Sequence, residues 1–252
     1  MQRPRAVLFD LDDTLAESFC APSPEILAGV QKLLERIPIA IITGATFPRM
    51  HEQFLSSLET HPRADQLYIF PTSSAQGYVF TDGAWKLLYD LSLNEESRTR
   101  IKKAIEDAVN SLEVLHNIPH YGERLIDKGA QIAYTHVGVD ASKEVKDSWD
   151  PDGAKRQALW SALKKSLPEF EVLMGGITTI DITLKDVNKS HSVAWLSDRL
   201  GIPASDMLYV GDALYEGGND AVVIPTGIQT RSVSGPAETQ QVINELLAAC
   251  KA

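Results

Sequence analysis

Short apolar runs alternate with amphipathic segments along the first seventy residues. The apolar runs lie at 6–9, 37–42 and 67–70. Between the first two, Ile26, Val30 and Leu33 recur at helical spacing, and a second helix is predicted at 47–58. Short apolar runs are typical of buried parallel strands, and apolar residues every three to four positions are typical of amphipathic helices. The order strand, helix, strand, helix, strand predicts an α/β fold with a doubly wound parallel sheet.

The pattern changes in the middle of the chain, where hairpin signals replace the parallel rhythm. Strands at 78–80 and 85–89 flank the turn Thr81-Asp82-Gly83, and strands at 124–126 and 131–135 flank Asp127-Lys128-Gly129. Turns of this composition join antiparallel strands. The other predicted elements here are helices at 94–112 and 152–166 and strands at 171–174 and 179–183. Hairpins combined with helices predict an inserted α+β domain that contains an antiparallel sheet.

The α/β rhythm resumes at Lys189. The predicted elements are a helix at 189–200, strands at 207–210 and 222–224, and a final helix at 236–249. Gly201 and Pro203 mark the end of the first of these helices, as glycine and proline commonly do. We therefore expect a discontinuous Rossmann-like core made of 1–90 and 187–252, interrupted by an insert at 91–186.

Composition excludes several classes of protein. With 252 residues, 44% hydrophobic and 23% charged, the chain has an ordinary globular composition and no apolar stretch of membrane-spanning length. Its two cysteines form neither a disulfide framework nor a zinc motif, which fits a reducing cytoplasm. The net charge of −10 disfavours nucleic acid as a partner and requires a local positive site for any anionic substrate. We expect a soluble cytoplasmic protein.

Three carboxylates, Asp10, Asp12 and Asp13, follow the first predicted strand within four residues. Ligands of open α/β sheets bind at the carboxyl ends of the strands. Carboxylates this close repel one another unless a cation neutralises them, so the cluster indicates a metal site. On these residues alone, an Asp-rich turn that caps a helix is an equally physical interpretation.

Other polar residues follow the ends of core elements and decide between these interpretations. They are Thr43, Lys189, Asp212, Asn219 and Asp220. Taken singly, Thr43 can simply end a strand and Lys189 can be an ordinary solvated residue in a first helical turn. Taken together, they would meet at one crevice of the sheet. A group of carboxylates, a hydroxyl and an ammonium is suited to phosphoryl transfer.

These residues, in this order, resemble the motifs of the haloacid dehalogenase (HAD) superfamily. The matching segments are DLDDTL, IITGAT, DVNKSH and GDALYEGGND. The insert at 91–186 falls where that superfamily's type IIB cap falls. The resemblance implies a HAD-like core, a cap that sets substrate specificity, and Mg²⁺-dependent transfer through an aspartyl-phosphate.

The resemblance also implies a role for each core residue. Asp10 is the nucleophile, Asp12 is the general acid and base, and Asp13 has neither role. Thr43 and Lys189 hold the phosphoryl oxygens, with Gly44 beside them at the substrate. Mg²⁺ is bound by the Asp10 side chain, the Asp12 backbone carbonyl and the Asp212 side chain. The supporting loop consists of Gly211, Asn219 and Asp220.

Within the type IIB branch, the chain is most similar to eukaryotic-type phosphomannomutases. The segments that carry this similarity are TFPRMHEQF, GGITTIDITLKDVNK and SVSGPAETQQVI. It implies that Thr179 and Asp181 bind substrate, and that the mutases pair through their caps, so either a monomer or a cap-mediated homodimer is expected. The mutase cap carries arginines that grip a second phosphate. In this chain Arg124 and Lys128 are the only cations of the paired strands, and they join Thr179 and Asp181 as candidate substrate-binding residues. Lys128 and Val139 each stand where an arginine is expected.

The sequence therefore predicts a Mg²⁺-dependent hydrolase of a small sugar phosphate. A phosphomannomutase that interconverts hexose 1- and 6-phosphates is the alternative, because the core motifs are shared. A catalytically silent protein that binds a phosphorylated metabolite is more remote, because Asp10, Asp12, Lys189 and Asp212 are all present.

Overall fold

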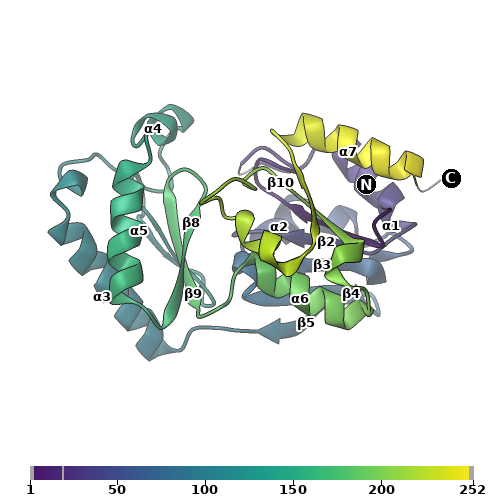
Figure 1. Cartoon of the computed structure of the whole chain (residues 1–252), viewed down its shortest axis with the longest axis horizontal. Helices are drawn as coiled ribbons and strands as arrows, with labels where there is room; N and C mark the ends of the chain where they lie inside the picture. The colour runs from purple at the N-terminus through teal and green to yellow at the C-terminus, as the bar shows by residue number, and fades with distance from the viewer. Residues whose placement is uncertain (1–2, 19, 250–252) are drawn as a thin grey trace. The chain divides into compact units, whose positions relative to one another are not determined.

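The structure of this protein is a computed structural model that describes residues 3–18 and 20–249 (Figure 1). The chain divides into two compact units, with boundaries between Asp90 and Leu91 and between Asn188 and Lys189. Each unit contains a β-sheet and a hydrophobic core of its own. Within the described ranges, none of the helices is both long and apolar enough to span a membrane.

The first unit is built on a seven-stranded sheet with the strand order β11-β10-β1-β2-β3-β4-β5. Its strands are β1 (Ala6–Asp10), β2 (Ile39–Ile42), β3 (Leu67–Phe70), β4 (Gln76–Thr81), β5 (Ala84–Asp90), β10 (Met207–Gly211) and β11 (Gln229–Ser232). The five strands from β11 to β3 pair in parallel, and the hairpin β4–β5 extends the sheet in antiparallel fashion. The carboxyl ends of β1, β2, β3 and β10 therefore lie along one edge of the sheet.

Helices cover both faces of this sheet, which makes its central strands apolar on both sides. The helices of this unit are α1 (Pro24–Leu34), α2 (Phe47–Gln53), α6 (Lys189–Leu200) and α7 (Pro236–Ala249). Val7 and Phe9 of β1 pack with α1, α2 and α7, whereas Leu8 packs on the opposite face with α6. Because side chains alternate along a strand, Asp10 lies on the same face as Leu8. The end of β1 thus directs Asp10 toward the face on which α6 packs.

The turn after β3 has a strained backbone. Thr72, Ser73 and Ser74 have φ angles of 49°, 54° and 71°, in the left-handed region that favours glycine. Each such residue costs about 1–3 kcal/mol and persists only where its surroundings over-determine it. Here the Thr72 N–H donates to the Ala45 carbonyl at 2.8 Å, and the Tyr89 hydroxyl donates to the Ser74 carbonyl at 3.0 Å. The surrounding contacts hold this turn in place at the carboxyl edge of the sheet.

The second unit contains a four-stranded antiparallel sheet with the order β6-β7-β9-β8. Its elements are α3 (Glu95–Ser111), β6 (Leu125–Asp127), β7 (Ile132–Thr135), α4 (Lys143–Ser148), α5 (Ala154–Ser166), β8 (Phe170–Gly175) and β9 (Thr179–Leu184). Figure 1 shows α3 and α5 along one face of this sheet, and Ile101, Ile105, Leu159 and Leu163 of these helices join its hydrophobic core. The predicted fold class, an α/β parallel sheet with an α+β insert, is confirmed.

Two sequence predictions of local structure need correction, and one element was missed. The segment Val222–Ile224 is not a strand, because it lies in a 3₁₀ helix (Ala221–Thr226) that contains Pro225; the edge strand is β11, seven residues further along. The helix predicted at 47–58 ends at Gln53, since Phe54 has non-helical angles of −158° and −22°. The short helix α4 was not predicted.

Candidate active site

A buried ammonium joins two carboxylates at the carboxyl edge of the main sheet. Lys189, the first residue of α6, places its Nζ 2.7 Å from Asp10 Oδ1 and 2.7 Å from Asp220 Oδ1. The three side chains are 4%, 7% and 0% exposed, in the order Lys189, Asp10 and Asp220. A buried charge is stable only when it is paired and hydrogen-bonded. This triad therefore depends on all three of its members.

Both carboxylate oxygens of Asp220 accept hydrogen bonds, and one of them holds the Lys189 ammonium in place. Its Oδ1 also accepts a hydrogen bond from the Tyr209 hydroxyl at 2.5 Å, and its Oδ2 accepts one from the Ala213 N–H at 3.0 Å. Gly211 makes room for this carboxylate, because a Cβ at that position would lie 2.2 Å from Asp220 Oδ2. Two of the three residues predicted as the supporting loop, Gly211 and Asp220, thus act together.

Burial and like charges set the electrostatics of the group. Burial, together with Asp220 and Asp212, raises the pKa of Asp10 well above its usual value, although Lys189 opposes that rise. Burial and the Asp220 charge also raise the pKa of Asp212. Burial disfavours the charged form of Lys189, but the charges of Asp10 and Asp220 prevail and raise its pKa. One ammonium does not neutralise three carboxylates, so the site retains an affinity for a further cation.

The donor set fits a hard divalent cation. Carboxylate oxygens of Asp10, Asp212 and Asp220 lie within 4.8 Å of one another, a spacing that allows them to hold a metal ion. Both oxygens of Asp220 already accept hydrogen bonds, whereas Lys189 occupies only one oxygen of Asp10. Asp212 Oδ1 accepts a long hydrogen bond of 3.4 Å from the Thr14 hydroxyl. Asp10 and Asp212 are therefore the residues that would hold the metal.

A second group of polar side chains surrounds Asp12. Thr43, at the end of β2, donates from its hydroxyl to Asp12 Oδ2 at 3.2 Å, and the same hydroxyl accepts a hydrogen bond from the Ala45 N–H at 3.0 Å. Arg49 of α2 binds the other oxygen, Asp12 Oδ1, at 3.2 Å. Gly44 lies half-buried between Thr43 and Ala45. The second carboxylate of the cluster is thus held at both oxygens.

The remaining predicted core residues take separate positions. Asp13 adopts a left-handed φ of 57°, and its carboxylate accepts hydrogen bonds from the Ser18 N–H and hydroxyl at 3.1 and 2.8 Å. Asn219 Oδ1 is buried without a hydrogen-bond partner in the part of the chain that the structure describes. Asp13 therefore stabilises its own loop, and Asn219 keeps an acceptor available beside Asp220.

Two contributors to the site were not predicted from the sequence. Arg49 lies six residues after Thr43, and a positive charge soon after a strand end was the available signal. Tyr209 is fully buried within β10, where a hydroxyl in an apolar strand indicates a buried hydrogen-bond partner. Both act on carboxylates that are distant in sequence, 37 residues away for Arg49 and 11 for Tyr209.

Comparison with known protein families identifies this arrangement. A model of the haloacid dehalogenase-like hydrolases matches residues 7–220. The chain belongs to this family. The matched range begins within β1 and ends at Asp220, so it contains the whole group of core residues described above. The chain is thus an enzyme of the HAD phosphatase or phosphomutase type, as its motifs predicted.

Curated relatives and solved structures extend the comparison over nearly the whole length. Phosphomannomutase 2 of Dictyostelium discoideum is 24% identical over 247 residues, which cover 94% of this chain and 94% of that protein. The phosphomannomutase of Arabidopsis thaliana is 24% identical over 253 residues, with coverages of 97% and 94%.

Two solved structures share the fold at low identity. IMP-bound IMP-nucleotidase of Plasmodium falciparum has a TM-score of 0.74 at 15% identity and covers 97% of this chain and 68% of that chain. The C-terminal domain of trehalose-6-phosphate phosphatase of C. albicans has a TM-score of 0.65 at 14% identity, with coverages of 98% and 94%.

Two of the four residues predicted to bind substrate in the second unit lie together on one face of its sheet. Ile180 and Ile182 of β9 pack into the hydrophobic core with the helices, so alternation places Thr179 and Asp181 on the opposite face. Opposite them across the ladder lie Thr135 and Ala133 of β7. This face, defined by Thr135, Ala133, Thr179 and Asp181, is called the polar cap face below.

The other two predicted substrate-binding residues, Arg124 and Lys128, lie immediately before and after β6, outside the set of residues that defines this face. The Arg124 guanidinium lies 6.0 Å from the ring centroid of Tyr134, a residue of the hydrophobic core. Lys128 lies in the turn between β6 and β7, where its N–H donates to the Gln131 carbonyl at 2.9 Å. The strands β6, β7, β8 and β9 all fall within the described residues, and they contain neither lysine nor arginine.

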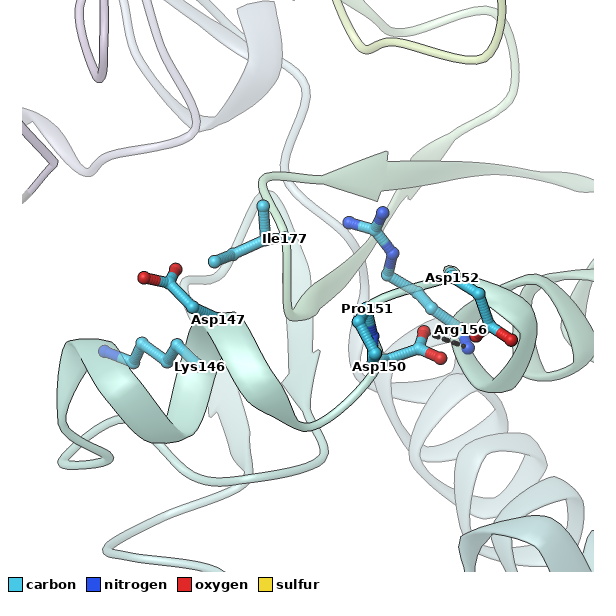
Figure 2. Close-up of a pocket in the computed structure, with 8 residues that line it drawn as sticks. Lys146, Asp147, Asp150, Pro151, Asp152, Arg156 and Ile177 are labelled. Atoms are coloured by element: carbon cyan, nitrogen blue, oxygen red, sulfur yellow. Dashed lines mark hydrogen bonds between the residues drawn. The ribbon is translucent and has the colours of Figure 1, made fainter.

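A hollow of about 340 Å³ near α4 and α5 has acidic lining residues that serve the fold (Figure 2). The Asp150 carboxylate accepts hydrogen bonds from the Lys155 and Arg156 N–H groups, both at 2.9 Å, and so caps the first turn of α5. The Arg156 guanidinium donates to the Gly176 carbonyl in the turn between β8 and β9. These contacts explain Asp150 and Arg156 of the hollow without a ligand.

Proposed function

We propose that this HAD-family enzyme hydrolyses a small sugar phosphate in a Mg²⁺-dependent reaction. The observation that carries the proposal is the buried Asp10–Lys189–Asp220 triad with Asp212 beside it. A phosphate ester resists nucleophiles because its oxygens are negative, so a catalyst must present a nucleophile together with positive charge. Asp10 with Lys189 meets this requirement, and Mg²⁺ on Asp10 and Asp212 would neutralise the remaining charge.

The chain's own residues account for both half-reactions. In the first, an Asp10 oxygen bonds to phosphorus, the ester P–O bond breaks, and Asp12 donates its proton to the leaving alkoxide. In the second, Asp12 takes a proton from water, the water oxygen bonds to phosphorus, and the bond to Asp10 breaks. The Thr43 hydroxyl and the Lys189 ammonium hold the phosphoryl oxygens. Arg49, which already contacts Asp12, orients its carboxylate.

The second unit acts as the cap that selects the substrate. The lack of cations on its described strands favours hydrolysis over a phosphomutase reaction. A phosphomutase must also bind a second phosphate of a bisphosphate at the cap, which requires cations. The cap strands carry none among their described residues, Val139 stands partly exposed where the resemblance expects arginine, and Arg124 lies over Tyr134. The threonine and aspartate side chains of the polar cap face can instead form hydrogen bonds with the hydroxyl groups of a sugar. Gln131, next to β7, adds a buried amide without a hydrogen-bond partner among the described residues.

Phosphomannomutase activity is the second candidate, favoured by the curated relatives that match along 94% of their length. One assay separates the two. With Mg²⁺, mannose 1-phosphate and a trace of hexose bisphosphate, we expect free phosphate to accumulate and chelation by EDTA to stop its release. Trehalose 6-phosphate and IMP complete the substrate panel, because proteins of this fold act on them.

The outcomes of this assay are distinct. Accumulation of mannose 6-phosphate without free phosphate would replace the hydrolase proposal by the mutase. Full turnover after chelation and dialysis would contradict the metal requirement, and restored turnover on adding Mg²⁺ would support it. Absence of turnover across the whole panel would contradict a small sugar phosphate as substrate.

Substitutions on the polar cap face are expected to change substrate choice. Asp181→Asn or Thr179→Val should change the ratio of kcat/KM between two sugar phosphates by about tenfold or more, since a hydrogen bond lost at a buried polar group costs about 1–3 kcal/mol. Turnover of p-nitrophenyl phosphate, which lacks sugar hydroxyls, should change far less. The matched control is Asp107→Asn, an exposed aspartate of α3 that pairs with Lys103. Equal ratios in all variants would refute the assignment of this face.

A further inference from the structure

The strained turn Thr72–Ser74 connects to Thr43 through the backbone. The Ser73 N–H donates to the Thr43 carbonyl at 2.8 Å, and the Thr72 N–H donates to the Ala45 carbonyl at 2.8 Å. These two bonds lie on either side of Gly44. The left-handed turn therefore holds the backbone of the loop that contains Thr43 on both sides of Gly44.

The same turn connects to Lys189 through side chains. The Ser74 hydroxyl donates to the Ser192 hydroxyl at 3.0 Å, and the Ser192 hydroxyl donates to the Lys189 carbonyl at 2.9 Å. Ser74 and Ser192 are fully buried, and Lys189 is nearly so. A continuous chain of hydrogen bonds thus runs from Ser74 to the first residue of α6, in a region from which water is excluded.

We propose that this turn sets the separation between the Thr43 hydroxyl and the Lys189 ammonium, and that Ser74 is a positioning residue for phosphoryl transfer. The inference rests on the proposed function, in which these two groups hold the transferring phosphoryl oxygens. Ser73 and Ser74, which are adjacent in this turn, contact the backbone of Thr43 and the hydrogen-bond chain to Lys189, respectively.

The strain of the turn supports a positioning role. Glycine would adopt the same φ angles at lower cost, yet Thr72, Ser73 and Ser74 stand at all three positions. Side chains at left-handed positions stiffen the turn, and the Ser74 hydroxyl is used for the link to Ser192. A rigid link between two binding groups is valuable because a misplacement of about 1 Å can reduce turnover by about 100-fold.

The test compares Ser74→Ala and Ser192→Ala with Ser197→Ala in the full chain. Ser197 is the matched control, because, like Ser192, it is a serine of α6 whose hydroxyl donates to a backbone carbonyl; its acceptor is the Ile202 carbonyl at 2.7 Å, and it is partly buried. We expect Ser74→Ala to lower kcat/KM for p-nitrophenyl phosphate with Mg²⁺ by about 10- to 100-fold. Affinity for orthovanadate, which mimics the transition state, should fall more than affinity for inorganic phosphate.

A double variant distinguishes positioning from ordinary stabilisation. If Ser74 and Ser192 act as one link, the Ser74→Ala, Ser192→Ala double variant should lose no more activity than Ser74→Ala alone. Additive losses, or a Ser74→Ala variant as active as Ser197→Ala, would overturn the inference while leaving the proposed function intact. If Ser74→Ala fails to fold, normal activity of Ser192→Ala overturns it instead. A wild-type chain that neither turns over substrate nor binds orthovanadate would overturn the proposed function and this inference with it.

Discussion

Replacing Asp10 by asparagine is expected to abolish phosphate release, with turnover reduced by about 10⁴-fold or more. The amide cannot attack phosphorus, yet its oxygen can still accept the hydrogen bond from Lys189 that Asp10 accepts now. The fold should persist, because the change removes a buried negative charge beside Asp220 and Asp212, which already raise the pKa of Asp10. Phosphate release, together with unfolding in urea, measures both effects.

The matched control for this prediction is Asp13→Asn. Asp13 carries the same carboxylate three residues away, and asparagine tolerates its left-handed φ of 57°. We expect near wild-type turnover from this variant, with some loss of stability from the weakened bonds to Ser18. Substantial turnover by the Asp10→Asn variant would exclude Asp10 as the nucleophile.

Replacing Lys189 by methionine is expected to lower the free energy of unfolding by about 3–5 kcal/mol at neutral pH, the typical cost of breaking a buried ion pair. Methionine preserves the apolar stem but leaves Asp10 and Asp220 buried without their ammonium. Turnover should also be lost, since in the proposed mechanism Lys189 both pairs with the nucleophile Asp10 and holds the phosphoryl group. Urea unfolding in the presence of EDTA isolates the effect of the ammonium from that of any bound metal.

The pH dependence of this loss gives a second readout. A buried carboxyl whose pKa is raised in the folded state binds more protons folded than unfolded, so its folded form gains stability as the pH falls through that range. Burial raises the pKa of Asp10, and loss of Lys189 raises it further. The difference in stability between wild type and Lys189→Met should therefore shrink toward pH 4. The control Lys32→Met removes an exposed lysine of α1 and should cost little at any pH. A pH-independent difference would contradict the ion-pair explanation.

Local sequence patterns predicted the strands that are buried throughout and the helices that have one buried side. The fully buried β1 and β10 read as apolar runs, and α1 reads as a helix because Ile26, Val30 and Leu33 form its buried side. The edge strand β11 was missed because its sequence, Gln-Thr-Arg-Ser, is half-exposed and polar. The neighbouring apolar segment Val222–Ile224 attracted the prediction instead, although Pro225 and the 3₁₀ geometry exclude it from the sheet.

No local sequence pattern predicted the left-handed turn either. Neither glycine nor asparagine, the residues by which such backbone angles are usually recognised, occurs at positions 72–74. Contacts from Thr43, Ala45 and Tyr89, which lie 15 to 30 positions away from their partners in the chain, hold the turn. Long-range contacts of this kind override local preference, and no local pattern reports them.

By itself, the sequence determined the fold class and the family, and it predicted most of the polar residues that meet at the site, because apolar periodicity and motifs can be read directly from the chain. The contacts that distinguish the carboxylates from one another were decided only by tertiary structure. Asp220 binds Lys189 across 31 residues and Tyr209 across 11, which saturates its oxygens and leaves Asp10 and Asp212 for a cation. The contact of Arg49 with Asp12 and the link from Ser74 to Lys189 likewise exist only once distant segments pack together. Distances, burial and the pKa shifts that follow from them are properties of that packing.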